Sequence, residues 1–176
     1  MNNDNLWAPW RMAYLRDLER KREQVGSPEP KSSNFFAEYW DRPQDDETNH
    51  VVYRNEHGII LLNRYPYANG HLLVALGEPR SELLAYEASQ RQAFWTLLET
   101  ATQLQQHTLR PQGVNIGINQ GEAAGAGVPA HLHAHVVPRW AGDTNFITVV
   151  GQVRVIPDAL EKMAQQYREM AGQLFG

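Results

Sequence analysis

Three histidines alternate with apolar residues in the run Ala130-His131-Leu132-His133-Ala134-His135-Val136-Val137-Pro138. Side chains on a β-strand alternate between two faces, so His131, His133 and His135 would project to one side, over about 13 Å. The intervening apolar side chains would then face a core. On a helix the same rings would scatter, so the pattern predicts a strand that presents three imidazoles together.

Three co-facial imidazoles suit nucleophilic catalysis at phosphorus. A neutral imidazole nitrogen can attack an α-phosphate and form a phosphoramidate, which splits one difficult displacement into two easier ones. Flanking histidines can hold its tautomer and donate to phosphate oxygens. The nearby loop Gly121–Gly127 has three glycines and three alanines, and exposed backbone N–H groups in such a loop can form an anion nest. The two features together favour a phosphate site.

Other interpretations of the same residues stay open. Histidines at alternate positions of a strand are common metal ligands, so a His-ligated metalloenzyme is one alternative. A purely structural histidine run is another, although burying three titratable rings together is costly. The glycine-rich segment taken alone is typical of a plain surface loop. We expect His50 and His57 to be surface or loop-packing histidines rather than ligands.

The elements that must position these residues follow from periodicity. Short β-branched and leucine-rich runs predict strands, the second and third joined by a long turn containing Pro66 and Asn69-Gly70. We expect a half-buried strand over 114–119, with Val114, Ile116 and Ile118 inward. A helix is predicted from Ser81, as its cap, to Leu109. The other expected elements are strands at 51–53, 59–63, 71–76 and 131–138, helices at 35–40 and 158–174, and a solvated acidic loop at 45–47. This order favours an antiparallel α+β fold.

Composition limits the class of protein. The net charge of −4 argues against a nucleic-acid-binding surface, and the chain has no cysteine, which excludes disulfides and thiolate metal sites. No run approaches the length of a membrane span, so we expect a cytoplasmic protein without a membrane partner. Residues 1–33, with the aromatic arm of Trp7 and Trp10 and a Pro/Ser-rich linker, are expected to precede a single domain over 34–176.

The sequence resembles the histidine triad (HIT) superfamily over approximately residues 50–150. The signature His-φ-His-φ-His-φ-φ, in which φ is an apolar residue, is present as His131 to Val137. The match extends to the strand 115–119 and the glycine loop, and to Leu62-Asn63-Arg64-Tyr65-Pro66 with Gly70-His71-Leu72-Leu73-Val74. Segments 7–14, 124–129 and 138–146 are similar to the bacterial branch related to diadenosine tetraphosphate phosphorylases, which cleave the dinucleotide with phosphate to give ADP and ATP.

The resemblance implies a role for each matching residue. His133 would be the nucleophile, His135 would hydrogen-bond the α-phosphate region, His131 would support the ring geometry, and His71 would orient the set. Asn63 matches a ribose contact and Asn119 a position near the phosphates, while Gly125, Ala126 and Gly127 would offer backbone N–H groups. The implied fold is an antiparallel sheet of about five strands with a long helix and a C-terminal helix. A homo-oligomer, at least a dimer, is also implied.

The function implied is transfer of a nucleotidyl group from an adenosine polyphosphate to His133 and then to phosphate or water. A phosphorylase is favoured over a hydrolase of dinucleoside polyphosphates or nucleoside phosphoramidates, and over a non-catalytic nucleotide-binding protein. No cofactor is expected, although the nucleotide could arrive with a divalent metal. The sequence departs from many relatives at Ala126 and Gly127, where they carry Gln, Ser or Thr. A Cys-x-x-Cys zinc site, found in some relatives, is impossible at Asn34–Ala37.

Overall fold

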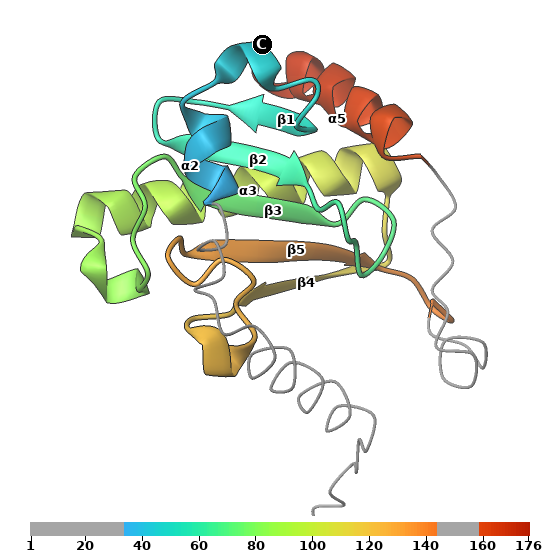
Figure 1. Cartoon of the computed structure of the whole chain (residues 1–176). Helices are drawn as coiled ribbons and strands as arrows, with labels where there is room; N and C mark the ends of the chain where they lie inside the picture. The colour runs from blue at the N-terminus through green and yellow to red at the C-terminus, as the bar shows by residue number, and fades with distance from the viewer. Residues whose placement is uncertain (1–33, 144–158) are drawn as a thin grey trace, which may run out of the picture. The chain divides into compact units, whose positions relative to one another are not determined.

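The computed structural model describes residues 34–143 and 159–176 of the chain. Its centre is one five-stranded sheet in the order β1-β2-β3-β5-β4, in which every neighbouring pair is antiparallel (Figure 1). The strands are β1 (Val51–Arg54), β2 (Gly58–Leu62), β3 (Leu72–Leu76), β4 (Gly113–Ile118) and β5 (His133–Arg139). The predicted α+β class and antiparallel sheet are confirmed. The expected arm and linker over 1–33 lie outside the described residues.

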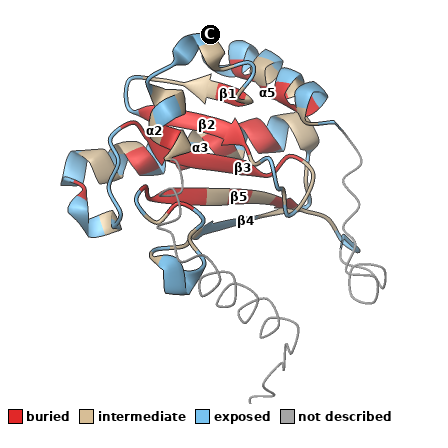
Figure 2. Ribbon diagram, in the orientation of Figure 1, coloured by how far each residue is buried: buried red, intermediate tan, exposed pale blue. Residues whose placement is uncertain are grey.

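Helices cover both faces of the sheet. The long helix α3 (Ala88–Leu109) and the C-terminal helix α5 (Leu160–Phe175) pack on one face, and the short helix α2 (Phe35–Trp40) lies on the other (Figure 1). Figure 2 shows that the central strands β2 and β3 are buried, whereas the edge strand β4 is largely exposed. No helix in the described ranges has both the length and the apolar character needed to cross a membrane.

The alternation of β5 sorts its side chains as predicted. Leu132, Ala134 and Val136 belong to the core between the sheet and the helices α3 and α5. The histidines project to the opposite face, where α2 packs. The strand itself begins at His133 rather than at residue 131, because the preceding backbone is held by a turn and a loop: His131 N–H donates to Val128 O, and Leu132 N–H donates to Arg80 O.

The predicted helix from Ser81 to Leu109 is wrong at its start. A 3-10 turn (Leu83–Ala85) comes first, and α3 begins only at Ala88, with Glu87 and Gln90 forming a reciprocal capping box. The reason lies at Tyr86, which is extended (ψ 145°). Its buried hydroxyl donates to Glu78 O and accepts from Arg80 N–H, so the chain cannot turn helically at this residue. The predicted end of the helix is correct.

Two further expectations need correction. In β4, Val114 and Ile118 pack partly against the core, but Ile116 is 47% exposed because β4 is the edge strand. The acidic loop at 45–47 is not simply solvated, because Asp46 pairs with Arg54 at 2.6 Å. His57 is exposed, as expected, and His50 lies half-buried 3.6 Å from Glu161 of α5.

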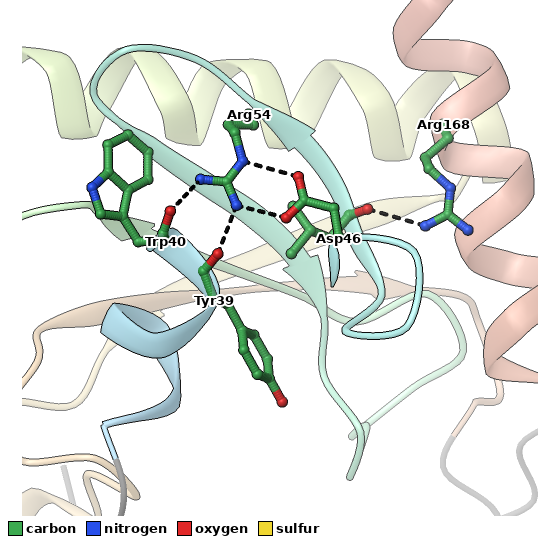
Figure 3. A network of polar contacts seen from close by, with 6 residues as sticks. Tyr39, Trp40, Asp46, Arg54 and Arg168 are labelled. Atoms are coloured by element: carbon green, nitrogen blue, oxygen red, sulfur yellow. Dashed lines mark hydrogen bonds and ion pairs between the residues drawn. The ribbon is translucent and has the colours of Figure 1, made fainter. Parts of the chain in front are cut away.

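Arg54 anchors α2 to the sheet. Its guanidinium donates to the carbonyl groups of Tyr39 and Trp40, at the C-terminal end of α2, over 2.7 and 2.9 Å (Figure 3). The same side chain pairs with Asp46, and Arg168 of α5 donates to Val51 O at 3.1 Å. Cationic donors at a helix C-terminus satisfy carbonyl groups that lack helical partners. The position of α2 on the sheet is thereby determined, which matters because α2 faces the histidines.

Candidate active site

Four histidines converge on the face of the sheet that carries α2. The rings of His71 and His135 have centroids 5.1 Å apart, and those of His133 and His135 are 5.3 Å apart. His71 and His131 are fully buried and His133 is only 4% exposed. The structure therefore brings together His133 and His135 of β5 with His131, which lies just before that strand. The fourth member, His71, directly precedes the neighbouring strand β3.

His133 is arranged as a nucleophile. Its Nδ1 atom lies 2.9 Å from the backbone carbonyl of His131, which can only accept, so the ring proton resides on Nδ1. The lone pair is then on Nε2. Burial lowers the pKa of His133 below its usual value, against the opposing effect of that backbone hydrogen bond. The imidazole is therefore neutral around pH 7, the form that can attack phosphorus.

His71 and His135 form a pair with a defined proton order. The backbone N–H of Tyr67 donates to Nδ1 of His71 at 3.1 Å, so this nitrogen is an acceptor. The proton of His71 is consequently on Nε2, which lies 3.0 Å from Nδ1 of His135 and donates to it. His135 must then carry its own proton on Nε2. Burial, and secondly the electrostatic interaction with His133, lower the pKa of His135 to about 4, so this ring is also neutral.

His131 is held on both sides. Its Nε2 lies 2.7 Å from Leu76 O and its Nδ1 lies 3.0 Å from Oδ1 of Asn34, two acceptors of which the neutral ring can donate to one. Burial lowers the pKa of His131, and the nearby His133 lowers it further. Because both ring nitrogens contact neighbouring groups, the His131 ring is suited to support the geometry of the site. Its backbone carbonyl orients the His133 ring.

The predicted nucleotide contacts divide into two groups. Asn63 lies beside the histidines, with its amide 3.3 Å from Nδ1 of His71 and its carbonyl accepting from Tyr65 N–H at 2.9 Å. Asn119 directly follows β4, and the register of Ile118 with Ala134, continued by one residue, sets it opposite His133. Both asparagines therefore adjoin the cluster.

The glycine loop is not the open nest that was expected. It contains a 3-10 turn over Glu122–Ala124, flanked by Gly121 and Gly125 at positive φ. Two of the three expected donors are used within the loop, since Gly125 N–H bonds Glu122 O and Ala126 N–H bonds Gly121 O. Of the expected set, only the N–H of Gly127 does not appear among the hydrogen bonds of the described residues.

A family model described as the HIT domain matches residues 44–142. The chain belongs to the HIT domain family. The AP-4-A phosphorylase of Mycobacterium tuberculosis (strain H37Rv) is 40% identical over 156 residues, which cover 88% of this chain and 77% of the relative. The asymmetrical bis(5'-nucleosyl)-tetraphosphatase of Schizosaccharomyces pombe is 30% identical over 93 residues, or 53% of this chain and 50% of the relative.

A solved structure supports the same fold. The crystal structure of a Zn-bound histidine triad family protein from Mycobacterium smegmatis aligns with a TM-score of 0.65 at 27% identity, covering 82% of this chain and 96% of that one. In the present HIT domain, no group of three or more His, Cys, Asp or Glu side chains within 34–143 and 159–176 is arranged to hold a metal ion.

Sequence reasoning missed the aromatic residues that enclose the histidines of this HIT domain. The Phe36 ring lies 4.7 Å from His133 and 5.3 Å from His131. The Tyr67 ring stacks on His71 at 4.8 Å and 28°. The available signals were the helix predicted for 35–40, which contains Phe36, and the position of Tyr67 in the turn before His71. Neither signal says which ring an aromatic side chain will meet.

Proposed function

We propose that this HIT domain protein is a nucleotidyl transferase that acts on adenosine polyphosphates through a covalent nucleotide on Nε2 of His133. The observation that carries the proposal is the opposite proton arrangement of two adjacent rings. His133 presents a lone pair on Nε2, whereas His135 presents an N–H on Nε2. A nucleophile beside a hydrogen-bond donor is what displacement at a phosphate ester requires.

The first displacement uses both rings. Nε2 of His133 attacks the α-phosphorus, a P–N bond forms, and the P–O bond to the departing polyphosphate breaks. The positive charge that develops on the imidazole is stabilised through Nδ1–H by the carbonyl of His131. His135 donates from Nε2 to the phosphoryl or leaving oxygen, and His71 supports that donor through its own N–H.

The second displacement restores the enzyme. An oxygen of inorganic phosphate attacks the same phosphorus, the P–N bond breaks, and ADP leaves; with water as acceptor the product is AMP. Two inversions at phosphorus give net retention of configuration. We favour phosphate as acceptor, that is, a diadenosine tetraphosphate phosphorylase, because the relative named AP-4-A phosphorylase matches at higher identity and over more of the chain than the relative named tetraphosphatase.

Product analysis tests the acceptor. Diadenosine tetraphosphate is incubated with the protein with and without inorganic phosphate, and nucleotides are separated by chromatography. We expect ADP plus ATP, dependent on phosphate. AMP plus ATP at the same rate in both reactions would instead identify a hydrolase, and cleavage of an adenosine phosphoramidate alone would identify the other hydrolase class.

The covalent step has its own test. Substrate labelled in the adenosine moiety is mixed with the protein without phosphate and quenched in denaturant at neutral to alkaline pH, where phosphoramidates survive. We expect labelled protein that loses its label in acid, and none with His133→Gly. His107→Gln, at an exposed position of α3, serves as the control. Binding of the dinucleotide without label transfer or product would favour a non-catalytic nucleotide-binding protein.

The proposal includes no resident metal. Dialysis against a chelator, followed by assay with magnesium as the counterion of the nucleotide, separates the alternatives. Restoration by magnesium alone agrees with the proposal, whereas a requirement for a transition metal would favour the His-ligated metalloenzyme. We also propose a homodimer, which the exposed side chains of Trp95 on α3 and Ile116 on the edge strand β4 support. Sedimentation equilibrium of the whole protein measures this directly.

A further inference from the structure

The carbonyl group of Gly70, the residue before His71, is held from the opposite side of the sheet. Gln105 of α3 donates to it from Nε2 at 3.1 Å, and the hydroxyl of Tyr167 of α5 donates to it at 2.9 Å. Both side chains are fully buried. The amide of Gln105 also donates to the carbonyl of Val136, the residue after His135, at 3.0 Å. One amide group thus joins the backbones next to His71 and His135.

The register explains why this carbonyl needs donors from helices. Strands β3 and β5 pair with Leu72 opposite Val136, and two residues further the same register sets Gly70 opposite Pro138. Proline has no N–H, so the ladder cannot continue there. Gly70 turns away at φ 78°, and a Cβ at this position would come within 2.8 Å of the Tyr167 hydroxyl. Gln105 and Tyr167 supply the donors that β5 lacks.

Burying the polar side chain of Gln105 costs free energy that packing alone does not explain. Its Oε1 atom is buried and has no hydrogen-bond partner among the residues that the structure describes, in a core otherwise built from apolar side chains. A methionine would fill similar volume with no unsatisfied oxygen. Tyr167 is likewise committed as a donor, because burial raises the pKa of its hydroxyl and keeps it protonated. What these two polar groups provide is control over the backbone at Gly70 and Val136.

We propose that Gln105 and Tyr167 are positioning residues for the His71–His135 pair. By fixing Gly70 relative to Val136, they set the 3.0 Å contact through which His71 donates to Nδ1 of His135. That contact keeps the proton of His135 on Nε2. The catalytic consequence rests on the function proposed above, whereas the effect on the proton order does not.

Two variants and one control test the proposal in the full-length protein. Gln105→Met keeps a side chain of similar length but removes the hydrogen bonds to the carbonyl groups of Gly70 and Val136. Tyr167→Phe removes only the hydroxyl that donates to Gly70 O. Thr102→Val is the matched control, because its hydroxyl, also on α3, donates to the helical carbonyl of Leu98 and not to the backbone beside a histidine. We expect kcat to fall roughly tenfold in each variant, as for a small displacement of catalytic groups, with KM within about twofold of the parent value. The double variant should lose less than the product of the two losses, since both donors serve one carbonyl.

Nitrogen-15 NMR of histidine-labelled protein supplies a readout independent of turnover. In the parent protein His71 and His135 should both give the signature of a ring protonated on Nε2, and Gln105→Met should give a mixture of tautomers for His135. Unchanged tautomers together with unchanged kcat in folded variants would overturn the proposal. Altered tautomers in a protein that does not turn over any dinucleotide would reject the proposed function alone. If Gln105→Met fails to fold, Tyr167→Phe decides by the same two measurements.

Discussion

The ring of Phe36 packs against the ring of His133 in a tilted arrangement, with a centroid distance of 4.7 Å and an interplanar angle of 35°. Phe36 is fully buried and comes from α2, while His133 comes from the fourth-placed strand of the sheet, β5. An apolar ring on one face of the imidazole excludes water from that face. Phe36 thereby contributes to the burial that is the main cause of the lowered pKa of His133, because the charged ring loses hydration.

Replacing Phe36 should therefore change the pH dependence of turnover. In Phe36→Leu, water gains access to His133, so its pKa rises and the acidic limb of kcat/KM moves to higher pH. Phe94→Leu makes the same chemical change in the core on the other face of the sheet and should leave that limb in place. Identical limbs in Phe36→Leu and the parent would contradict the role given to this ring. Phe36→Ala should cost about 3–5 kcal/mol of stability and is less informative.

The stability of the fold should fall in mild acid. The pKa values of His131, His133 and His135 are lowered in the folded protein, that of His135 to about 4, so the unfolded chain binds protons first. Stability is then complete above the unfolded histidine pKa of about 6.5 and decreases between that pH and about 4. Urea unfolding at several pH values measures the slope.

A histidine variant tests whether the buried histidines cause this dependence of stability on pH. His135→Asn should flatten the decrease between pH 6.5 and 4, because one group no longer differs between the folded and unfolded states. His107→Gln, on the exposed surface of α3, should follow the parent protein. Stability that stays constant or rises as the pH falls would show that burial does not hold these rings neutral.

The hydrogen bonds by which Arg54 anchors α2 should contribute more to the free energy of unfolding than an exposed ion pair does. Arg54→Met leaves the Trp40 carbonyl and Asp46 without their donor and removes one of the two donors to the Tyr39 carbonyl, and we expect a loss of about 1–3 kcal/mol in urea unfolding. Arg80→Met breaks an ion pair with Glu78 whose side chains are 48% and 45% exposed, and should cost about 0–1 kcal/mol. Equal losses of unfolding free energy in the two variants would contradict the anchoring role of Arg54.

The contact between Gly77 and the Trp40 indole gives a further test of α2. A Cβ at Gly77 would overlap the Trp40 ring, so Gly77→Ala should cost about 1–3 kcal/mol by overpacking. At Gly117, in the edge strand β4, such an atom would meet nothing within 4 Å in the described part of the chain. Gly117→Ala should be neutral or stabilise by about 0.4–1 kcal/mol. Thermal unfolding compares the two, and a neutral Gly77→Ala would mean that α2 tolerates displacement.

Local patterns predicted most of the elements but not all of their ends. The strands and the stop of α3 follow from β-branched runs and from Pro111 after the helix. The start of α3 could not be read in this way, because Tyr86 is held extended by the backbone of residues 78 and 80. The exposure of Ile116 also escaped the pattern, since alternation says which side chains share a face but not whether another element covers that face.

The sequence by itself determined that His131, His133 and His135 lie together, because alternation along an extended backbone is a local property. It also marked His71 and Asn63 through the family resemblance. Only the tertiary structure decided the state of those rings. The proton order of His71 and His135, the aromatic cover from Phe36 and the donors of Gln105 and Tyr167 depend on strand register and on helices far away along the chain. The local sequence therefore sets which histidines share a face, whereas their protonation states follow from the partners that folding brings into contact with them.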